Sequence, residues 1–377
     1  MRYLIALTLI STLAVSAPAL ADVPFGWIGN HHVNAYSLGA GEFTLSGNFA
    51  AVNDTIDFLN LRDRLLAGSQ RLVGNSGDLS SNGGELRVGV WQSIELFYRE
   101  NNQSLTLNLG TISSADVENL DNQLRTHTQA YGAKWVFYDA INQDRSYPWT
   151  SAALELTSNR SHSNDFGGYL AGLRTSSTGG VFFDPPGRFA LDRLQDDAWQ
   201  ARLLLSSALG NTTTATFWAG YGEANASSGT SWDIDIAFLR EAFLQTFDTE
   251  ETQYTLGMSL NWQYLPRLPV QIGYEYINIA DRQVNIIQGS GRFSNYLPSF
   301  LRGDQLSESE TRNHTLYGSV SWWVTPEIFI GAGGKLFSSQ FTGIIPHYTN
   351  PLSGSFSDTN YGYLELKLGL RFSLNWH

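Results

Sequence analysis

Histidine is the residue on which most catalytic or metal chemistry in this chain would depend, because the sequence has seven histidines and no cysteine. His31 and His32 are adjacent near the N-terminus, but two imidazoles without a third ligand are weak grounds for a metal site. His162 and Asp165 are the nearest approach to the imidazole and carboxylate that a protease would need. These positions predict neither a catalytic set nor a metal site.

Charged side chains also recur at alternate positions in several stretches, opposite apolar neighbours. Six are acidic and seven are basic: Glu42, Glu85, Arg87, Glu95, Arg99, Lys134, Glu155, Arg202, Glu275, Lys335, Glu365, Lys367 and Arg371. Rows of opposite charge attract one another, and in a water-filled pore they also create a field that orients polar solutes. Which role they have depends on the elements that position them.

Those elements are predicted to be β-strands, because apolar residues alternate with polar ones along the chain. Near the C-terminus, every second residue from Leu364 to Trp376 is apolar, and the residues between them are mostly polar. Residues 252–264 alternate in the same way. A strand places such residues on one face, whereas a helix would scatter them around its axis. Strands of about ten residues or more with this pattern are typical of a transmembrane β-barrel.

The predicted fold is therefore all-β, a single antiparallel transmembrane barrel with short turns on the periplasmic side and long loops on the extracellular side. Twelve strands are expected, near residues 42–60, 84–91, 94–101, 126–139, 149–161, 198–209, 212–223, 252–264, 269–283, 311–324, 327–341 and 358–375. Splitting the first span at Val52-Asn53-Asp54 and adding a strand before it would give about 14. The long polar stretches are expected to be loops: 62–83, 102–125, 162–197, 224–251, 284–310 and 342–357.

The N-terminus predicts export. Arg2 precedes an apolar run that ends in Ala19-Leu20-Ala21, the pattern of a secretory signal peptide cleaved after Ala21. Residues 1–21 are thus the expected signal peptide, and residues 22–377 the barrel. No later run is apolar enough for a membrane helix. The net charge of −12 argues against nucleic acid as a partner, and much of the acidic excess falls in the expected loops.

Aromatic residues gather near the ends of the predicted strands, as in the girdles of a membrane barrel. Those toward the short turns are Trp135, Phe137, Tyr147, Trp149, Tyr264, Trp322 and Trp323, and those toward the long loops are Tyr221, Tyr254, Tyr274, Tyr276 and Tyr361.

With its signal peptide, amphipathic strands and alternating last strand, the chain resembles the outer-membrane β-barrels of Gram-negative bacteria. The last strand of that family usually ends in an aromatic residue, and here Trp376 is followed by His377. The resemblance implies a place in the cell outer membrane. It also implies contact with membrane lipids and lipopolysaccharide, and insertion by the barrel-assembly machinery. It identifies no subfamily and no transported solute.

The lumen has two interpretations that the sequence leaves open. It is either a water-filled pore or a space largely filled by paired Lys, Arg and Glu side chains. The candidates for lining it are Lys134, Glu155, Arg202, Glu275, Lys335, Glu365, Lys367 and Arg371.

The function that these patterns favour is passive passage of small polar or amphipathic solutes, without a cofactor and without enzymatic activity. A closed barrel acting through its loops is the alternative. A lipid hydrolase is a third hypothesis, because outer-membrane phospholipases carry a Ser–His–Asn set on the outer wall. His314 follows Asn313 and shares the parity of the apolar Leu316, but the surrounding residues match no such motif.

Overall fold

The computed structural model describes residues 34–52, 74–109, 115–118, 123–140, 149–175, 179–210, 212–233, 247–265, 267–286, 308–338 and 360–373. They form the strands β1 (Glu42–Val52), β2 (Gly74–Trp91), β3 (Ile94–Leu109), β4 (Ala115–Glu118), β5 (Gln123–Asp139), β6 (Ser151–Ser163), β7 (Phe166–Thr175), β8 (Gly179–Ala208), β9 (Thr213–Asp233), β10 (Phe247–Leu265), β11 (Leu268–Ile286), β12 (Glu308–Trp323), β13 (Ile328–Ser338) and β14 (Asn360–Ser373). These residues include no helix that is long and apolar enough to cross a membrane.

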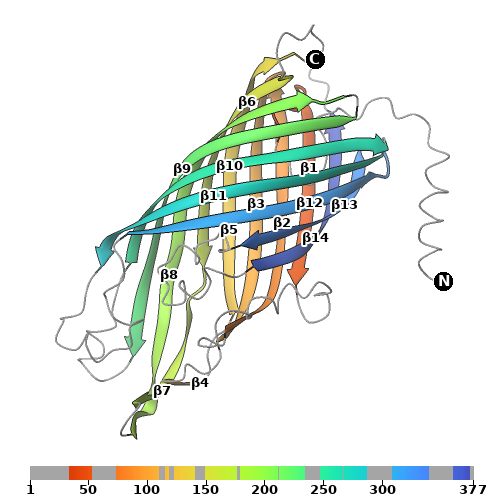
Figure 1. Cartoon of the computed structure of the whole chain (residues 1–377). Coiled ribbons are helices and arrows are strands. Elements are labelled where there is room, and N and C mark those ends of the chain that lie inside the picture. The colour runs from red at the N-terminus through yellow and green to blue at the C-terminus, as the bar shows by residue number, and fades with distance from the viewer. Residues whose placement is uncertain are drawn as a thin grey trace, which may run out of the picture.

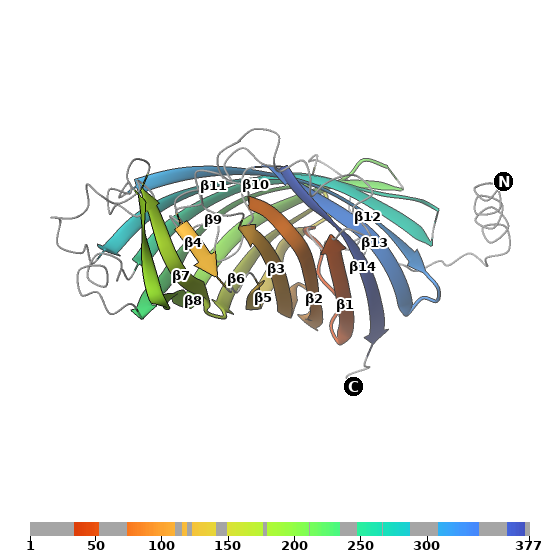
Figure 2. The ribbon, with the colours of Figure 1, turned by 90° about the horizontal axis from the view of Figure 1, so that it is seen from below.

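Twelve of the strands form a closed antiparallel barrel, in which each strand pairs with the next and β14 pairs with β1 (Figures 1 and 2). Closure satisfies the backbone N–H and C=O groups of every wall strand, which a hydrocarbon environment requires. The all-β barrel of 12 strands is confirmed. The alternative of a 14-strand barrel is wrong, because the two additional strands of the sheet lie outside the ring. β7 pairs with an extension of β8, and β4 pairs with β7.

The turns between strands are short at one end of the barrel, as predicted. Gln92 and Ser93 join β2 to β3, and residues 324–327 join β12 to β13. At the other end, several segments that were expected to be loops are strand. β8 begins at Gly179, β9 continues to Asp233 and β12 begins at Glu308. Their Gly, Ser and Asn content predicted loops, but pairing with a neighbouring strand keeps the backbone extended beyond the apolar part of the wall.

The β7–β8 hairpin is the largest of these extensions, and it projects beyond the other strands at the bottom of Figure 1. Its paired part, from Phe166 to Leu191, lies within the segment 162–197 that was predicted to be a loop. β4, within the predicted loop 102–125, pairs with β7.

Side chains alternate between the two faces of the wall as the sequence pattern predicted. In β10, Leu256, Met258, Leu260 and Trp262 point outward and are each 51–56% exposed, while Thr255, Ser259 and Asn261 point inward and are buried. Leu366, Leu368, Leu370 and Phe372 form the corresponding outer row of β14. Most of the large hydrophobic residues of these two strands therefore form an outer wall rather than a conventional core.

Aromatic side chains mark both ends of the apolar wall. Trp135, Phe137 and Trp322 are exposed near the short turns. Toward the other end the rings contact one another across strands, with centroids 5.4 Å apart for Tyr221 and Tyr254. The prediction that Trp323 belongs to the aromatic girdle is wrong. Its side chain is only 1% exposed and lies inside the barrel against Phe329. Successive residues of a strand face opposite sides, so Trp322 and Trp323 cannot both belong to the outer girdle. The side chains of Tyr147, Tyr264 and Tyr361 lie outside the described residues.

Inward-facing aromatic rings lie against glycines of the neighbouring strand. A Cβ atom on Gly257 would be 2.1 Å from the Trp218 ring, and one on Gly132 would be 2.0 Å from the Phe97 ring. Glycine is required where a ring approaches the backbone this closely. The absence of a side chain at these glycines leaves room for the large rings beside the inner wall.

Candidate functional site: the interior of the barrel

A row of alternating charges crosses four neighbouring strands of the inner wall. Glu95 on β3, Lys134 on β5, Glu155 on β6 and Arg202 on β8 are direct register partners in that order. Lys134 Nζ lies 3.5 Å from Glu95 Oε2, and Arg202 Nε donates to Glu155 Oε1 at 3.1 Å. The Arg202 Nη2 atom donates to the same carboxylate oxygen. We call these four residues the charged row.

The charged row continues into a second cluster on β2 and β3. Arg87 bridges two carboxylates, with Nε 2.5 Å from Glu85 and Nη1 2.6 Å from Glu95. Arg99 Nη2 lies 2.7 Å from the other oxygen of Glu85. Arg87, Glu85 and Glu95 are all buried. Each buried charge in this cluster has a partner of opposite sign, as burial requires.

The remaining predicted lining residues lie around these two groups. Glu365 and Lys367 on β14 are buried on the inner face, and Arg371 Nη2 lies 2.6 Å from Glu42 on β1. Glu275 on β11 accepts a hydrogen bond from Trp218 Nε1 at 3.2 Å. The side chain of Lys335 lies outside the described residues. The structure thus brings Lys134, Glu155 and Arg202 together and places Lys367 and Arg371 on the other side of β1 and β2.

The next part of the inner wall around the ring, beyond β8, carries mainly uncharged polar groups. Its buried members on β9 to β12 are Thr214, Thr216, Thr255, Ser259, Asn261, Gln271, Thr315, Ser319 and Ser321. One part of the inner wall can therefore act on charged groups, and the neighbouring part can offer hydroxyl and amide hydrogen bonds. All of these groups lie at the inward positions of their strands.

A short segment of the chain, Asn34–Gly41, lies inside the barrel near the end with the short turns. We call it the N-terminal segment. The Ala35 N–H donates to Ser206 Oγ at 2.9 Å, and Ser151 Oγ donates to the Ala35 carbonyl at 2.6 Å. The Leu38 N–H donates to Glu95 Oε2 at 3.0 Å, which joins the segment to the charged row. Ala35 and Leu38 are 0% and 2% exposed.

Further contacts hold the same segment on the wall. The Tyr36 hydroxyl lies 2.9 Å from Thr150 Oγ1, and Ser37 Oγ donates to the Gln92 carbonyl at 3.0 Å. At its end the chain turns into β1 through Gly41, whose φ of 78° is in the left-handed region that favours glycine. A Cβ atom on Gly89 of β2 would lie 2.0 Å from the Gly39 carbonyl oxygen. The absence of a side chain at Gly89 therefore lets the segment pack directly against the backbone of β2.

Buried apolar side chains fill the lumen at this level. Ala35 belongs to a cluster that includes Val136 on β5 and Tyr317 on β12, which stand on opposite sides of the twelve-strand ring. Leu38 packs in a second cluster with Trp323 and Phe329. Sequence reasoning missed this feature, because residues 34–41 are too short and irregular to show any periodicity. The interior is filled here by the N-terminal segment together with wall side chains.

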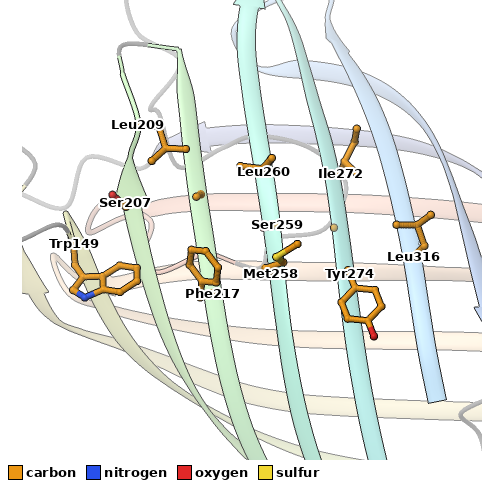
Figure 3. Close-up of a pocket in the computed structure, with 12 residues that line it drawn as sticks. Trp149, Ser207, Leu209, Phe217, Met258, Ser259, Leu260, Ile272, Tyr274 and Leu316 are labelled. Atoms are coloured by element: carbon orange, nitrogen blue, oxygen red, sulfur yellow. The ribbon is translucent and has the colours of Figure 1, made fainter. Parts of the chain in front are cut away.

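The outer wall has a shallow groove of about 510 Å³ across β9 to β12 (Figure 3). Its rim is formed by Phe217, Met258, Leu260, Ile272 and Leu316, all of them exposed and apolar. Such a lining suits the hydrocarbon of a membrane and offers few polar groups to a soluble ligand.

The histidines that the structure describes face outward near the end with the long extensions. His314 Nδ1 lies 2.7 Å from the Tyr274 hydroxyl, and its ring packs near that of Tyr276. His127 and His162 are register partners with ring centroids 5.0 Å apart. His31 and His32 lie outside the described residues.

An antiparallel sheet that closes on itself, an apolar outer wall with aromatic residues at both ends, and a polar interior define a transmembrane β-barrel. This is the class of protein that spans bacterial outer membranes with strands. No protein-family model matches the sequence, and a search of curated proteins finds no match.

Similar solved structures include an outer-membrane channel, the translocator domain of an autotransporter and a toluene transporter. One is an outer-membrane channel from Pseudomonas putida F1, with 9% identity and a TM-score of 0.43, covering 90% of this chain and 98% of that one. Another is the translocator domain of the autotransporter NalP from Neisseria meningitidis, with 7% identity and a TM-score of 0.48, covering 89% and 90%. The toluene transporter TodX of P. putida has 10% identity and a TM-score of 0.40, covering 89% and 90%.

Proposed function

We propose that this chain is an outer-membrane channel for passive passage of small polar or amphipathic solutes. The observation that carries the proposal is the polar inner wall. Around one closed ring, the charged row on β3, β5, β6 and β8 is followed by hydroxyl and amide groups on β9 to β12. A solute with both charged or dipolar and hydrogen-bonding groups would meet complementary partners on these neighbouring parts of the wall.

A closed barrel that acts through its extracellular extensions is the second candidate. It is favoured by the burial of Lys134 and Glu155, each 2% exposed, and by the apolar cluster that joins opposite walls around Ala35. The β7–β8 hairpin would then be the interaction surface, because it projects beyond the other strands. The two candidates differ in one measurable property, the passage of ions through the lumen.

Single-channel recording in planar lipid bilayers tests the proposal. We expect stepwise conductance from refolded protein, and a change in anion-to-cation selectivity when Arg202 is replaced by Glu. Leu260→Ala is the matched control, because Leu260 is an outward side chain of the wall and cannot touch a passing ion. Conductance that is absent from well-folded protein under every voltage and salt condition would refute the channel and leave the closed barrel.

The compartment and the partners belong to the same proposal. The chain is exported with a signal peptide that is removed after Ala21, and the barrel-assembly machinery inserts it into the outer membrane. There its wall contacts lipid and lipopolysaccharide. The mass of the protein purified from outer membranes tests both the compartment and the cleavage site. The expected result is a mature chain that begins at Asp22. A retained N-terminus would refute cleavage at this position.

A further inference from the structure

We propose that the N-terminal segment, Asn34–Gly41, is an autoinhibitory plug that closes the periplasmic end of the lumen and moves to open it. The inference rests on the proposed channel function, because a plug has meaning only in a barrel that conducts. It concerns residues that the sequence marks with no motif.

The segment lies where it blocks passage. The cluster around Ala35 reaches from Val136 on β5 to Tyr317 on β12, and these strands stand opposite each other in the ring. Leu38 fills the space beside Trp323 and Phe329. With both side chains buried, this cross-section of the lumen is occupied by protein atoms. An ion or solute could pass this level only after the segment had moved.

The segment is held by contacts that can be broken without opening the wall. Six of the hydrogen bonds that join it to the barrel use at least one side chain, and they involve Glu42, Glu95, Thr150, Ser151, Ser206 and the Ser37 hydroxyl. The Gly41 N–H also donates to the Gly89 carbonyl. Each wall strand is instead held by a continuous backbone ladder to its neighbours, such as the pairing of β1 with β14 from Glu42 to Ala51. The cost of releasing the segment is therefore a small part of the cost of unfolding the barrel.

One inner-wall position controls how closely the segment can approach. Gly89 of β2 has no side chain, and a Cβ atom there would lie 2.0 Å from the Gly39 carbonyl oxygen and 2.9 Å from that of Leu38. A methyl group at this position must push the segment away from the wall. Gly84, on the same strand, is a matched control, because a Cβ atom there would be 3.5 Å from its nearest neighbour, which is ordinary contact.

The first experiment compares Gly89→Ala with Gly84→Ala in planar bilayers. Overpacking of this size shifts the closed-to-open ratio by roughly five- to a hundredfold. We therefore expect a several-fold or larger rise in the time-averaged conductance of Gly89→Ala, and wild-type conductance from Gly84→Ala. Equal conductance from Gly89→Ala and the wild type would overturn the plug.

The second experiment fixes the segment to the wall with an engineered disulfide bond. Because the chain has no cysteine of its own, no native thiol can react in this experiment. Ala35→Cys and Ser206→Cys are introduced into Gly89→Ala, since the Ala35 nitrogen and Ser206 Oγ are 2.9 Å apart. Oxidation should return the conductance to the wild-type level, and reduction should restore the rise. Leu45→Cys with Leu86→Cys is the control, because these register partners link β1 to β2 on the outer wall. Insensitivity of the locked variant to oxidation would overturn the inference.

A third readout separates failure of the plug from failure of the channel. A single cysteine in place of Leu38 should react with a maleimide at least several-fold faster in the Gly89→Ala background than in the wild-type background. Faster labelling without conductance from any variant would refute the channel, and the gating role with it. Conductance from all variants with equal labelling rates would leave the channel standing and refute the plug alone.

Discussion

Replacement of Glu155 by Gln should destabilise the barrel by about 3 kcal/mol, at the lower end of what removal of one member of a buried ion pair costs. Glu155 is 2% exposed and lies between two cations in the charged row, Lys134 and Arg202. Lys134 keeps Glu95 at 3.5 Å, and the Arg202 side chain is 17% exposed, so neither cation is left wholly uncompensated. These two facts place the cost near the lower end of the range.

The assay is urea unfolding of the barrel in lipid vesicles, followed by tryptophan fluorescence. A double-mutant cycle of Glu155→Gln with Arg202→Met isolates the pair, and we expect a coupling free energy of about 1.5–3 kcal/mol for a charge-assisted hydrogen bond. Glu327→Gln is the matched control, since Glu327 lies exposed in a short turn and should shift the unfolding free energy by less than ~0.5 kcal/mol. A loss below about 1 kcal/mol for Glu155→Gln, with coupling near zero, would refute the view that the charged row stabilises the wall.

Three further predictions concern the outer wall, the inner wall and the lumen. Leu368→Arg, on the outward row of β14, should cost about 2–4 kcal/mol of folding free energy in vesicles, whereas a loss near zero would place this row away from hydrocarbon. Gly132→Ala should cost about 1–3 kcal/mol because its methyl group meets the Phe97 ring, and Phe97→Leu should recover part of that loss in the same urea assay. Charge reversal of Lys367 and Arg371 should move the reversal potential toward cation selectivity, and an unchanged potential would remove both from the lining.

The barrel itself follows from the sequence because side-chain alternation has a period of two on every wall strand. A one-residue shift in register would move Leu256 or Leu368 from the outer face to the lumen, so the apolar pattern determines both the strands and their orientation. The same rule assigned Lys134, Glu155 and Arg202 to the interior, where the structure places them. It also separates Trp322 from Trp323, which a count of aromatic residues near a strand end does not.

The strand extensions and the N-terminal segment could not be predicted from the sequence, because they depend on contacts between distant segments. The extension of β8 from Gly179 contains several glycines and the pair Pro185-Pro186, and only its partners on β7 and β9 make it a strand. The N-terminal segment has no periodicity at all. Its place inside the barrel depends on single contacts to residues as remote as Ser206, and no local pattern encodes them.

The pairing of the first wall strand with the last has a consequence for assembly. Until β14 joins β1, from Glu42 opposite Ser373 onward, the sheet is an open trough with two unpaired edges. The wall residues that form the hydrogen bonds described above with the N-terminal segment precede β9 in the chain, so this polar side of its binding surface is present while the trough is still open. The apolar side, with Tyr317, Trp323 and Phe329, is added by β12 and β13. The segment can be laid down first and enclosed when the seam forms. It never has to be threaded into a finished ring, and a chain that lacked β14 would display it to the solvent.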